Sequence, residues 1–399
     1  MSFLETQPRC TIVRVDGYQV QISGKTTWVF LCLGFSSGVN GWGEATLFGA
    51  ERELESLLNR LQESLRVEPA QDIADLIGRF RQANMSGARA TFASALEQAW
   101  LHGLSQMASV PLYCLFGGAE RENVSFYANI NRGIADRSPK GFAEQAEKAL
   151  ASSGAQAVKI APFDGLRWDS TPLRQQAKLI DNGLQRIAAV REKLHAGQKL
   201  LVDCHARFNP YLARSIFCDL GALGVFWVEE PCAMASLSGQ EQRSLRQSAN
   251  ASDLMLAGAE TVSNLAEMEL VLAGEGHDVV LPDIRMTGVA DGIAMLRLAA
   301  AKQIACSLHN PVGPVLDAVS THVAAALPSF LILERQVGES AKFDEIRGSE
   351  TNVSSGSVTV DRQQGIGFFP DENALDPLDV RQLETALSFA GMSGAGPDA

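Results

Sequence analysis

The chain has 399 residues, of which 46% are hydrophobic and 20% charged, proportions typical of soluble globular proteins. Intrinsic disorder and low-complexity architectures are therefore excluded, and the length suffices for two or three domains or for one large barrel with an appendage. The formal net charge of −12 argues against nucleic acid or an anionic membrane as the main partner. It leaves room for a small anionic substrate, because a bound divalent cation can reverse the local field.

The cysteines and the start of the chain bear on its cellular compartment. The seven cysteines are widely spaced and include no C-x-x-C pair, so neither a zinc ribbon nor a disulfide scaffold is predicted. We expect reduced thiols. The first ten residues contain no apolar signal core, and the apolar run Trp28–Phe35 is too short to span a bilayer. Both observations lead us to expect a cytoplasmic protein.

The first third of the chain reads as a small α+β domain. Residues 10–48 contain two extended, β-branched and apolar runs and are predicted to form strands. From residue 51 to 115 the period becomes helical, with Leu54, Leu57, Leu58 and Leu61 at three- and four-residue spacing. We therefore predict an N-terminal α+β capping domain over residues 1–124.

After Gly117-Gly118, short apolar strands alternate with helices. The predicted strands lie near 125–129, 157–161, 200–204, 225–229, 255–259, 279–281, 304–308 and 331–333. Eight strands with intervening helices match a (β/α)₈-type barrel, here over residues 125–360, with an open doubly wound sheet as the alternative. No glycine-rich nucleotide motif follows any strand. We expect residues 361–399 to return to the cap, with the last eight or so disordered.

Ionisable residues stand at the ends of seven consecutive barrel strands. In chain order these are Lys159, Asp203, Glu229, Glu260, Asp283, His309 and Glu334. Barrel active sites lie at the carboxyl ends of the strands. A run of seven charged strand ends is improbable by chance at average composition, so this face is the predicted active site.

Three carboxylates come from adjacent strands. Asp203, Glu229 and Glu260 would repel one another in a partly desolvated site, and a hard divalent cation with oxygen ligands, most naturally Mg²⁺, resolves that repulsion. The alternative is three ordinary salt bridges. Glu229 and Glu230 are neighbours, so only one of them is expected to face the mouth.

Two histidines and an arginine complete the polar set. His205 stands two residues after Asp203 and is expected on the same strand face, as an acid, a base, a substrate donor, a further ligand or a structural histidine. Arg207 continues that face and either binds substrate or neutralises acids. Asp283 and His309 end neighbouring strands, so the carboxylate can hold one ring nitrogen and leave the other as a base.

Lys159 and Glu334 leave alternatives open. Lys159 supplies charge for a carboxylate substrate, or a base if its pKa is lowered, or is simply a solvated lysine. Glu334 donates a hydrogen bond if protonated, or pairs with Arg335.

These residues resemble the enolase superfamily, in its mandelate racemase/muconate lactonising branch, over nearly the whole chain. The resemblance rests on Gly41-Trp-Gly-Glu-Ala45, Val202-Asp203, Val228-Glu-Glu-Pro231, Ala257-Gly-Ala-Glu260, Pro282-Asp283, Ser307-Leu-His309 and Leu333-Glu334. It implies metal ligands at Asp203, Glu229 and Glu260, a His309–Asp283 base, and a homo-oligomer, either a dimer or an octamer.

One position departs from the family pattern. The family often carries a K-x-K pair on the second barrel strand; Lys159 matches its first lysine, and Ala161 stands in place of the second. Loss of that amine weakens a racemase interpretation, because racemisation needs proton carriers on both faces of the substrate. The Asp203-x-His205 pattern is similar to acid-sugar dehydratases of the superfamily, in which this histidine assists departure of the β-hydroxyl.

The predicted function is therefore a Mg²⁺-dependent dehydratase of a small carboxylate, an acid sugar. His309, held by Asp283, removes the proton α to the carboxylate, and His205 protonates the leaving hydroxyl. Lys159, Arg207 and Glu334 bind the substrate. The alternatives are a racemase, epimerase or lactone cycloisomerase with the same fold, and, more remotely, a non-catalytic protein that binds metal or sugar acids.

Overall fold

The computed structural model of the chain describes residues 11–24, 26–70, 73–78 and 86–378. The expected disorder of residues 392–399 lies outside these ranges. Among the helices within them, none combines the length and apolar composition that crossing a bilayer requires.

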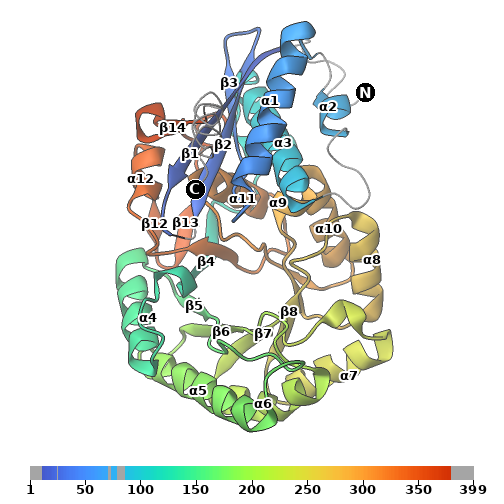
Figure 1. The fold of residues 1–399 in the computed structure, drawn as a ribbon, viewed down its shortest axis with the longest axis vertical. Helices are drawn as coiled ribbons and strands as arrows, with labels where there is room; N and C mark the ends of the chain where they lie inside the picture. The colour runs from blue at the N-terminus through green and yellow to red at the C-terminus, as the bar shows by residue number, and fades with distance from the viewer. Residues whose placement is uncertain (1–10, 25, 71–72, 79–85, 379–399) are drawn as a thin grey trace, which may run out of the picture.

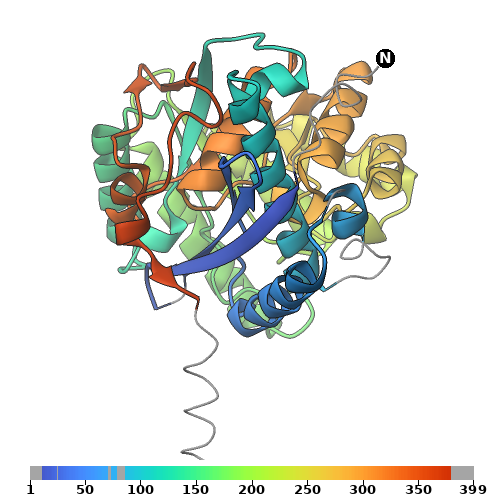
Figure 2. The same cartoon turned by 90° about the horizontal axis from the view of Figure 1, so that it is seen from above.

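A four-stranded antiparallel sheet and three helices form the cap. The sheet order is β14-β1-β2-β3, and the strands are β1 (Ile12–Gln21), β2 (Thr27–Phe35), β3 (Asn40–Glu44) and β14 (Asp376–Pro377). Because Tyr18 of β1 pairs with Pro377, a segment from near the end of the chain adds a strand to the first sheet. The helices are α1 (Glu51–Val67), α2 (Ile73–Gly78) and α3 (Gly87–Met107), which lie together beside the sheet in Figures 1 and 2.

Eight parallel strands follow in the described part of the chain and curve into a ring (Figure 1). Their order is β11-β4-β5-β6-β7-β8-β9-β10. No continuous ladder joins β10 to β11 here; an isolated parallel bridge between Cys306 and Phe330 links these two ends. The strands are β4 (Asn123–Asn129), β5 (Ala157–Ile160), β6 (Lys199–Asp203), β7 (Val225–Glu229), β8 (Met255–Gly258), β9 (Val279–Val280), β10 (Ala305–Cys306) and β11 (Leu333–Gln336).

Helices connect these strands and surround the ring on the outside (Figure 1). A short hairpin of β12 (Val353–Ser354) and β13 (Ser357–Thr359) pairs antiparallel with β4. The predicted fold class, a (β/α)₈-type barrel with an α+β cap, is thereby confirmed. The helices that follow the barrel strands are α4 (Pro139–Ser153), α5 (Leu173–Arg191), α6 (Pro210–Ala222), α7 (Gly239–Asn250), α8 (Leu265–Gly274), α9 (Ile284–Thr287), α10 (Val289–Ala301), α11 (Pro314–Ala325) and, after the last strand, α12 (Lys342–Arg347).

The last barrel strand lies further along the chain than predicted. It was expected at 331–333, whereas β11 begins at Leu333 and pairs with β4 as far as Gln336. Leu331 instead donates its backbone N–H to Cys306 in the bridge to β10. Glu334 therefore lies within the strand and not at its end.

Side-chain alternation along the strands places the site above an apolar floor. Ala157, Leu201 and Trp227 point into the barrel and pack together there. The side chain two residues later on each strand points the same way, one layer nearer the carboxyl end. Lys159, Asp203 and Glu229 therefore stand on this floor.

Two buried glutamates of the cap bind the amino ends of barrel helices. Glu44 accepts hydrogen bonds from the backbone N–H groups of Gly313, at 2.7 Å, and Leu316, at 3.1 Å, where α11 begins. Glu97 of α3 accepts from the first two N–H groups of α10, those of Val289 and Ala290, at 2.9 and 3.1 Å. Carboxylates at helix amino ends satisfy donors that the helix itself leaves unpaired. These bonds help to fix the cap over the barrel.

The strand β3 lies directly against the backbone of α3. A Cβ atom added at Gly43 would stand 1.9 Å from the carbonyl oxygen of Ala95. We expect Gly43→Ala to lower the free energy of unfolding by about 3 kcal/mol, because the helix or the strand must move to admit the methyl group. Denaturant unfolding measures the loss. Gly24→Ala is the matched control, since no described atom lies within 4 Å of its added Cβ; an equal, small effect at both positions would contradict the close packing.

Three histidines are buried as neutral rings. Burial lowers the pKa of His102 to about 3 and those of His277 and His322 to about 4. An unfolded histidine titrates near 6.5, so between pH 4 and 6.5 the unfolded chain binds protons that the folded chain excludes, and stability falls as the pH falls. At pH 5 the cost is about 2 kcal/mol per histidine.

His277 offers the cleanest test of this acid sensitivity, because neither ring nitrogen has a hydrogen-bonding partner among the described residues. When the pH is lowered from 7.5 to 5, we expect the free energy of unfolding of His277→Phe to fall by about 2 kcal/mol less than that of the parent chain. Denaturant unfolding at the two pH values measures both changes. The exposed His195→Gln should lose as much as the parent. Equal losses in the parent and His277→Phe would show that His277 is not held neutral.

Candidate active site

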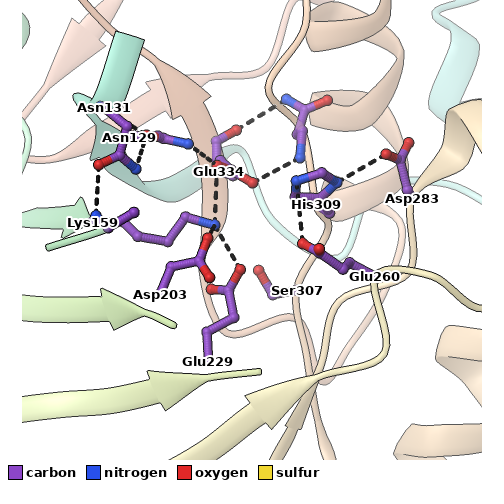
Figure 3. A network of polar contacts seen from close by, with 12 residues as sticks. Asn129, Asn131, Lys159, Asp203, Glu229, Glu260, Asp283, Ser307, His309 and Glu334 are labelled. Atoms are coloured by element: carbon purple, nitrogen blue, oxygen red, sulfur yellow. Dashed lines mark hydrogen bonds and ion pairs between the residues drawn. The ribbon is translucent and has the colours of Figure 1, made fainter. Parts of the chain in front are cut away.

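The carboxylates of the predicted metal site lie at the carboxyl end of the barrel (Figure 3). Asp203 and Glu229 are the last residues of β6 and β7 and are paired in the parallel ladder, so they stand at the same level. Glu260 follows the end of β8 by two residues, after Ala259, whose φ of +76° turns the chain. The predicted convergence of Asp203 and Glu229 thus follows from strand register.

Lys159 is fully buried among these carboxylates. Its Nζ lies 2.7 Å from Oε1 of Glu229, 3.2 Å from Oε1 of Glu334 and 4.0 Å from Oδ2 of Asp203. Burial alone would lower the pKa of Lys159, but Glu229 and Glu334 outweigh it and raise the pKa well above the ordinary value. The solvated-lysine alternative is therefore wrong, and Lys159 is a buried cation here.

Glu334 shows neither of its predicted pairings. Arg335 pairs with Asp317 at 2.9 Å, while Glu334 accepts from Asn129 Nδ2 at 2.5 Å and from the backbone N–H of Asn310 at 2.9 Å. Burial raises the pKa of Glu334, yet Lys159 and the neighbouring donors lower it overall. Glu334 is thus a carboxylate and an acceptor. It does not pair with Arg335 because successive residues of a strand face opposite ways, and only Glu334 points inward.

Asp283 and His309 are brought together as a pair. Asp283 Oδ2 lies 2.9 Å from His309 Nδ1, and Arg285 forms a bidentate ion pair with the same carboxylate. His309 Nε2 lies 3.3 Å from Glu260 Oε2. Burial lowers the pKa of His309, but Glu260 and Asp283 raise it to about 9. Nδ1 is committed to Asp283, so Nε2 is the nitrogen that can face a substrate.

His205 lies beside Asp203, although for a different reason from the one expected. The strand ends at Asp203, and His205 has a left-handed φ of +48°, so a tight turn and not strand alternation places it there. Its Nε2 lies 3.0 Å from Oδ2 of Asp203, while its side chain is 47% exposed. The hydrogen bond to Asp203 raises the pKa of His205, and despite burial the pKa of Asp203 is lowered to about 2.

Glu230 does not share the mouth with Glu229. It also turns with a positive φ, of +39°, and its Oε1 accepts the backbone N–H of Ala259 at 2.7 Å. Burial raises the pKa of Glu230 to about 7.

The donor chemistry of Asp203, Glu229 and Glu260 suits a hard divalent cation. Oε2 of Glu229 is buried without a hydrogen-bonding partner among the described residues. Burial, followed by the charges of Asp203 and other carboxylates, raises the pKa of Glu229 well above its ordinary value despite Lys159. In the described part of the chain no three such side chains are gathered in ligating geometry. Lys159, His205 and His309 lie against these carboxylates. An orphaned oxygen and surplus negative charge are what a cation would relieve.

A cavity of about 930 Å³ reaches this site between the cap and the barrel mouth. Thr26, Leu47 and Phe48 of the cap line it, and so do Ala161, His205, Arg207 and Arg285 of the barrel. Arg207 thus faces the expected space, whereas Lys159 lies beneath the cavity wall.

Three further residues belong to the site: Asn129, to which the sequence assigned no role, and Asn131 and Arg285, which no sequence pattern singled out. Asn129 and Asn131 stand two apart at the end of a predicted strand, which is a signal that could have drawn attention to them.

Two family models match the chain. Residues 141–374, more than half of it, match the enolase C-terminal domain-like family, and residues 12–117 match the mandelate racemase/muconate lactonizing enzyme N-terminal domain. The chain belongs to the mandelate racemase/muconate lactonizing enzyme family. Enzymes of this superfamily use a divalent metal ion.

Similar proteins align with this chain over most of their length. The chain is 24% identical to D-xylonate dehydratase of Haloferax volcanii over 96% of this chain and 93% of that protein. It is 24% identical to D-galactonate dehydratase of Xanthomonas euvesicatoria over 87% and 90% of the respective chains. The structure of an enolase superfamily member from Salmonella Typhimurium superposes with a TM-score of 0.76 and 21% identity, over 92% of this chain and 97% of that one.

Proposed function

We propose that this mandelate racemase/muconate lactonizing enzyme family member is an acid-sugar dehydratase. It removes the proton α to a carboxylate, eliminates the β-hydroxyl as water and yields a 2-keto-3-deoxy sugar acid. The observation that carries the proposal is a pair of histidines at the barrel mouth, each held by an aspartate: His309 by Asp283 at 2.9 Å and His205 by Asp203 at 3.0 Å. The names of the xylonate and galactonate dehydratases that it resembles support the same reaction class.

His309 is the proposed base. Glu260 and Asp283 raise the pKa of the ring, and Asp283 holds Nδ1, so Nε2 takes the α-proton. Asp203, Glu229 and Glu260 would hold a divalent cation, which we propose to be Mg²⁺; when bound it supplies positive charge to the substrate carboxylate. Lys159, kept protonated by Glu229 and Glu334, adds a fixed positive charge beneath the site.

His205 is the proposed acid. It is half-exposed in the cavity, and its raised pKa favours the protonated form that a leaving hydroxyl needs. The C–O bond at the β-carbon breaks, the hydroxyl takes the proton of His205 and departs as water, and the enol that remains tautomerises to the 2-keto acid. Arg207, which lines the same cavity, is proposed to contact substrate oxygens, and Glu334 to act by orienting Lys159 and Asn129.

Racemisation, epimerisation and lactone cycloisomerisation are less well supported. Racemisation needs a second proton carrier across the substrate from His309. Ala161 supplies none, and Lys159 is a fully buried cation in three ion pairs. A binding protein without turnover has no support beyond Ala161.

The test is incubation of the purified protein with Mg²⁺ and a panel of acid sugars in D₂O. Formation of 2-keto acid, with a mass loss of one water, would support the dehydratase. Deuterium incorporation at the α-carbon without 2-keto acid would overturn it in favour of a racemase or epimerase.

A further inference from the structure

The cavity over the barrel mouth carries more positive than negative side chains. Five arginines line it, against Asp164 and Glu339, in a chain whose net charge is −12. The arginines are Arg132, Arg137, Arg186, Arg207 and Arg285. A cationic chamber in an acidic protein points to an anionic ligand.

Two of these arginines are neutralised individually. Arg132 pairs with Glu339 at 3.2 Å, and Arg285 forms a bidentate pair with Asp283. By contrast, Arg137 and Arg186 share one carboxylate, that of Asp164, at 2.7 and 3.2 Å. This pair therefore keeps one uncompensated positive charge at the cavity wall.

The arginine pair is rigidly held. Arg137 Nη2 donates to the backbone carbonyl of Ala161 at 2.9 Å, and Arg186 Nε donates to that of Arg137 at 2.8 Å. Both guanidinium groups lie over the ring of Phe142, at 4.4 and 5.1 Å from its centroid. Such groups lose little conformational entropy when they bind a ligand.

Donor capacity remains free on this pair. No hydrogen bond from Arg186 Nη2 is formed to any described residue, although Nε and Nη1 are both engaged. The Arg137 and Arg186 side chains are 32% and 14% exposed. A planar anion at the cavity wall can therefore be reached by fixed N–H groups.

The pair stands on the opposite side of the barrel from the proposed base. Arg137 is bound to Ala161, directly after β5, whereas His309 follows β10. Around the ring, in which an isolated bridge links β10 to the β11 end, β5 lies three strands from β10 in one direction and five in the other. A substrate whose reacting carboxylate lies at the carboxylate cluster can thus extend its far end toward Arg137 and Arg186.

We propose that Arg137 and Arg186 bind a second carboxylate at the far end of the substrate, so that the preferred substrates are diacid sugars (aldaric acids). This inference rests on the proposed dehydratase function and specifies its substrate class. A carboxylate matches the planar, bidentate geometry of guanidinium groups and cancels the excess charge. The terminal hydroxyl of an aldonic acid does neither.

The experiment compares substrates that differ only at the far carbon. The Mg²⁺-loaded protein is assayed for water loss with the full sets of five- and six-carbon aldaric acids and with the aldonic acid of matching stereochemistry in each case. We expect kcat/KM to be at least tenfold higher for the diacid. In Arg186→Gln the diacid-to-monoacid ratio should fall by about 10- to 100-fold, since bonds to charged groups are lost. Arg186→Lys should restore part of it.

Arg243→Gln is the control, because it removes the same charge from an exposed site on α7 and should leave the ratio unchanged. Calorimetric binding of each acid to the Mg²⁺-loaded protein separates the two hypotheses. Turnover with a preference for monoacids, or a ratio unmoved in Arg186→Gln, overturns the diacid site while the dehydratase stands. Diacid binding that depends on Arg186, without water loss, supports the site and overturns the dehydratase. Absence of both binding and turnover overturns the diacid site.

Discussion

Replacement of His309 by asparagine is expected to abolish exchange of the substrate α-proton with solvent. Asparagine can still lie beside Asp283, but it has no basic nitrogen to replace Nε2. General-base catalysis is typically worth about 10²–10⁴-fold, so both exchange and water loss should fall by that factor. NMR in D₂O measures the exchange, and a 2-keto acid assay measures the water loss.

The surface variant His195→Asn, on the loop before β6, is the control for this change and should keep both activities. Tm is compared for both variants, since His309 also lies between Asp283 and Glu260. Exchange that persists in a folded His309→Asn protein would contradict the base assignment and direct attention to His205 or Lys159.

Replacement of His205 by asparagine is expected to separate the two steps. Loss of the general acid should slow departure of the β-hydroxyl by about 10²–10⁴-fold, while His309 continues to exchange the α-proton. The same D₂O incubation reports both, as deuterium in recovered substrate and as 2-keto acid. The His205 side chain is 47% exposed, and its turn is held by a hydrogen bond from the His205 backbone N–H to Oδ1 of Asp203. The variant keeps that backbone hydrogen bond and should therefore fold normally.

The outcome for His205 also tests the alternative roles considered for it. Parallel loss of exchange and water loss would contradict a dedicated acid and would indicate that His205 binds the substrate or supports Asp203. An unchanged rate of water loss would assign the acid to another group.

The location of the site could be predicted from sequence because it follows from local periodicity. Side chains alternate along a strand, and parallel strands end at one face. Asp203 and Glu229 illustrate this: each closes an apolar run, and their pairing in register follows once the strands are adjacent. The Asp283–His309 pair was predictable only in part. Their strands are consecutive, but β9 ends at Val280 and β10 at Cys306, so both residues lie in the loops beyond the strand ends at which they were expected.

Charge states and turn geometry were less accessible. Lys159 was open to three interpretations, and only the distances to Glu229 and Glu334 show it as a buried cation. His205 reaches Asp203 through a left-handed turn that strand alternation does not anticipate. Glu334 was assigned to a strand end because the register of β11 depends on β4, some two hundred residues earlier.

By itself, the sequence determined the fold class, the face of the barrel that carries the chemistry and the residue types that stand there. Each of these depends on short-range spacing, which a single chain displays directly. The tertiary structure alone decided which groups share a proton or a charge: Lys159 among three carboxylates, the cap glutamates on α10 and α11, and Arg137 with Arg186 on Asp164. Such electrostatic partnerships join residues distant in sequence, and their energies depend on separations of a few ångströms and on burial that no local pattern specifies.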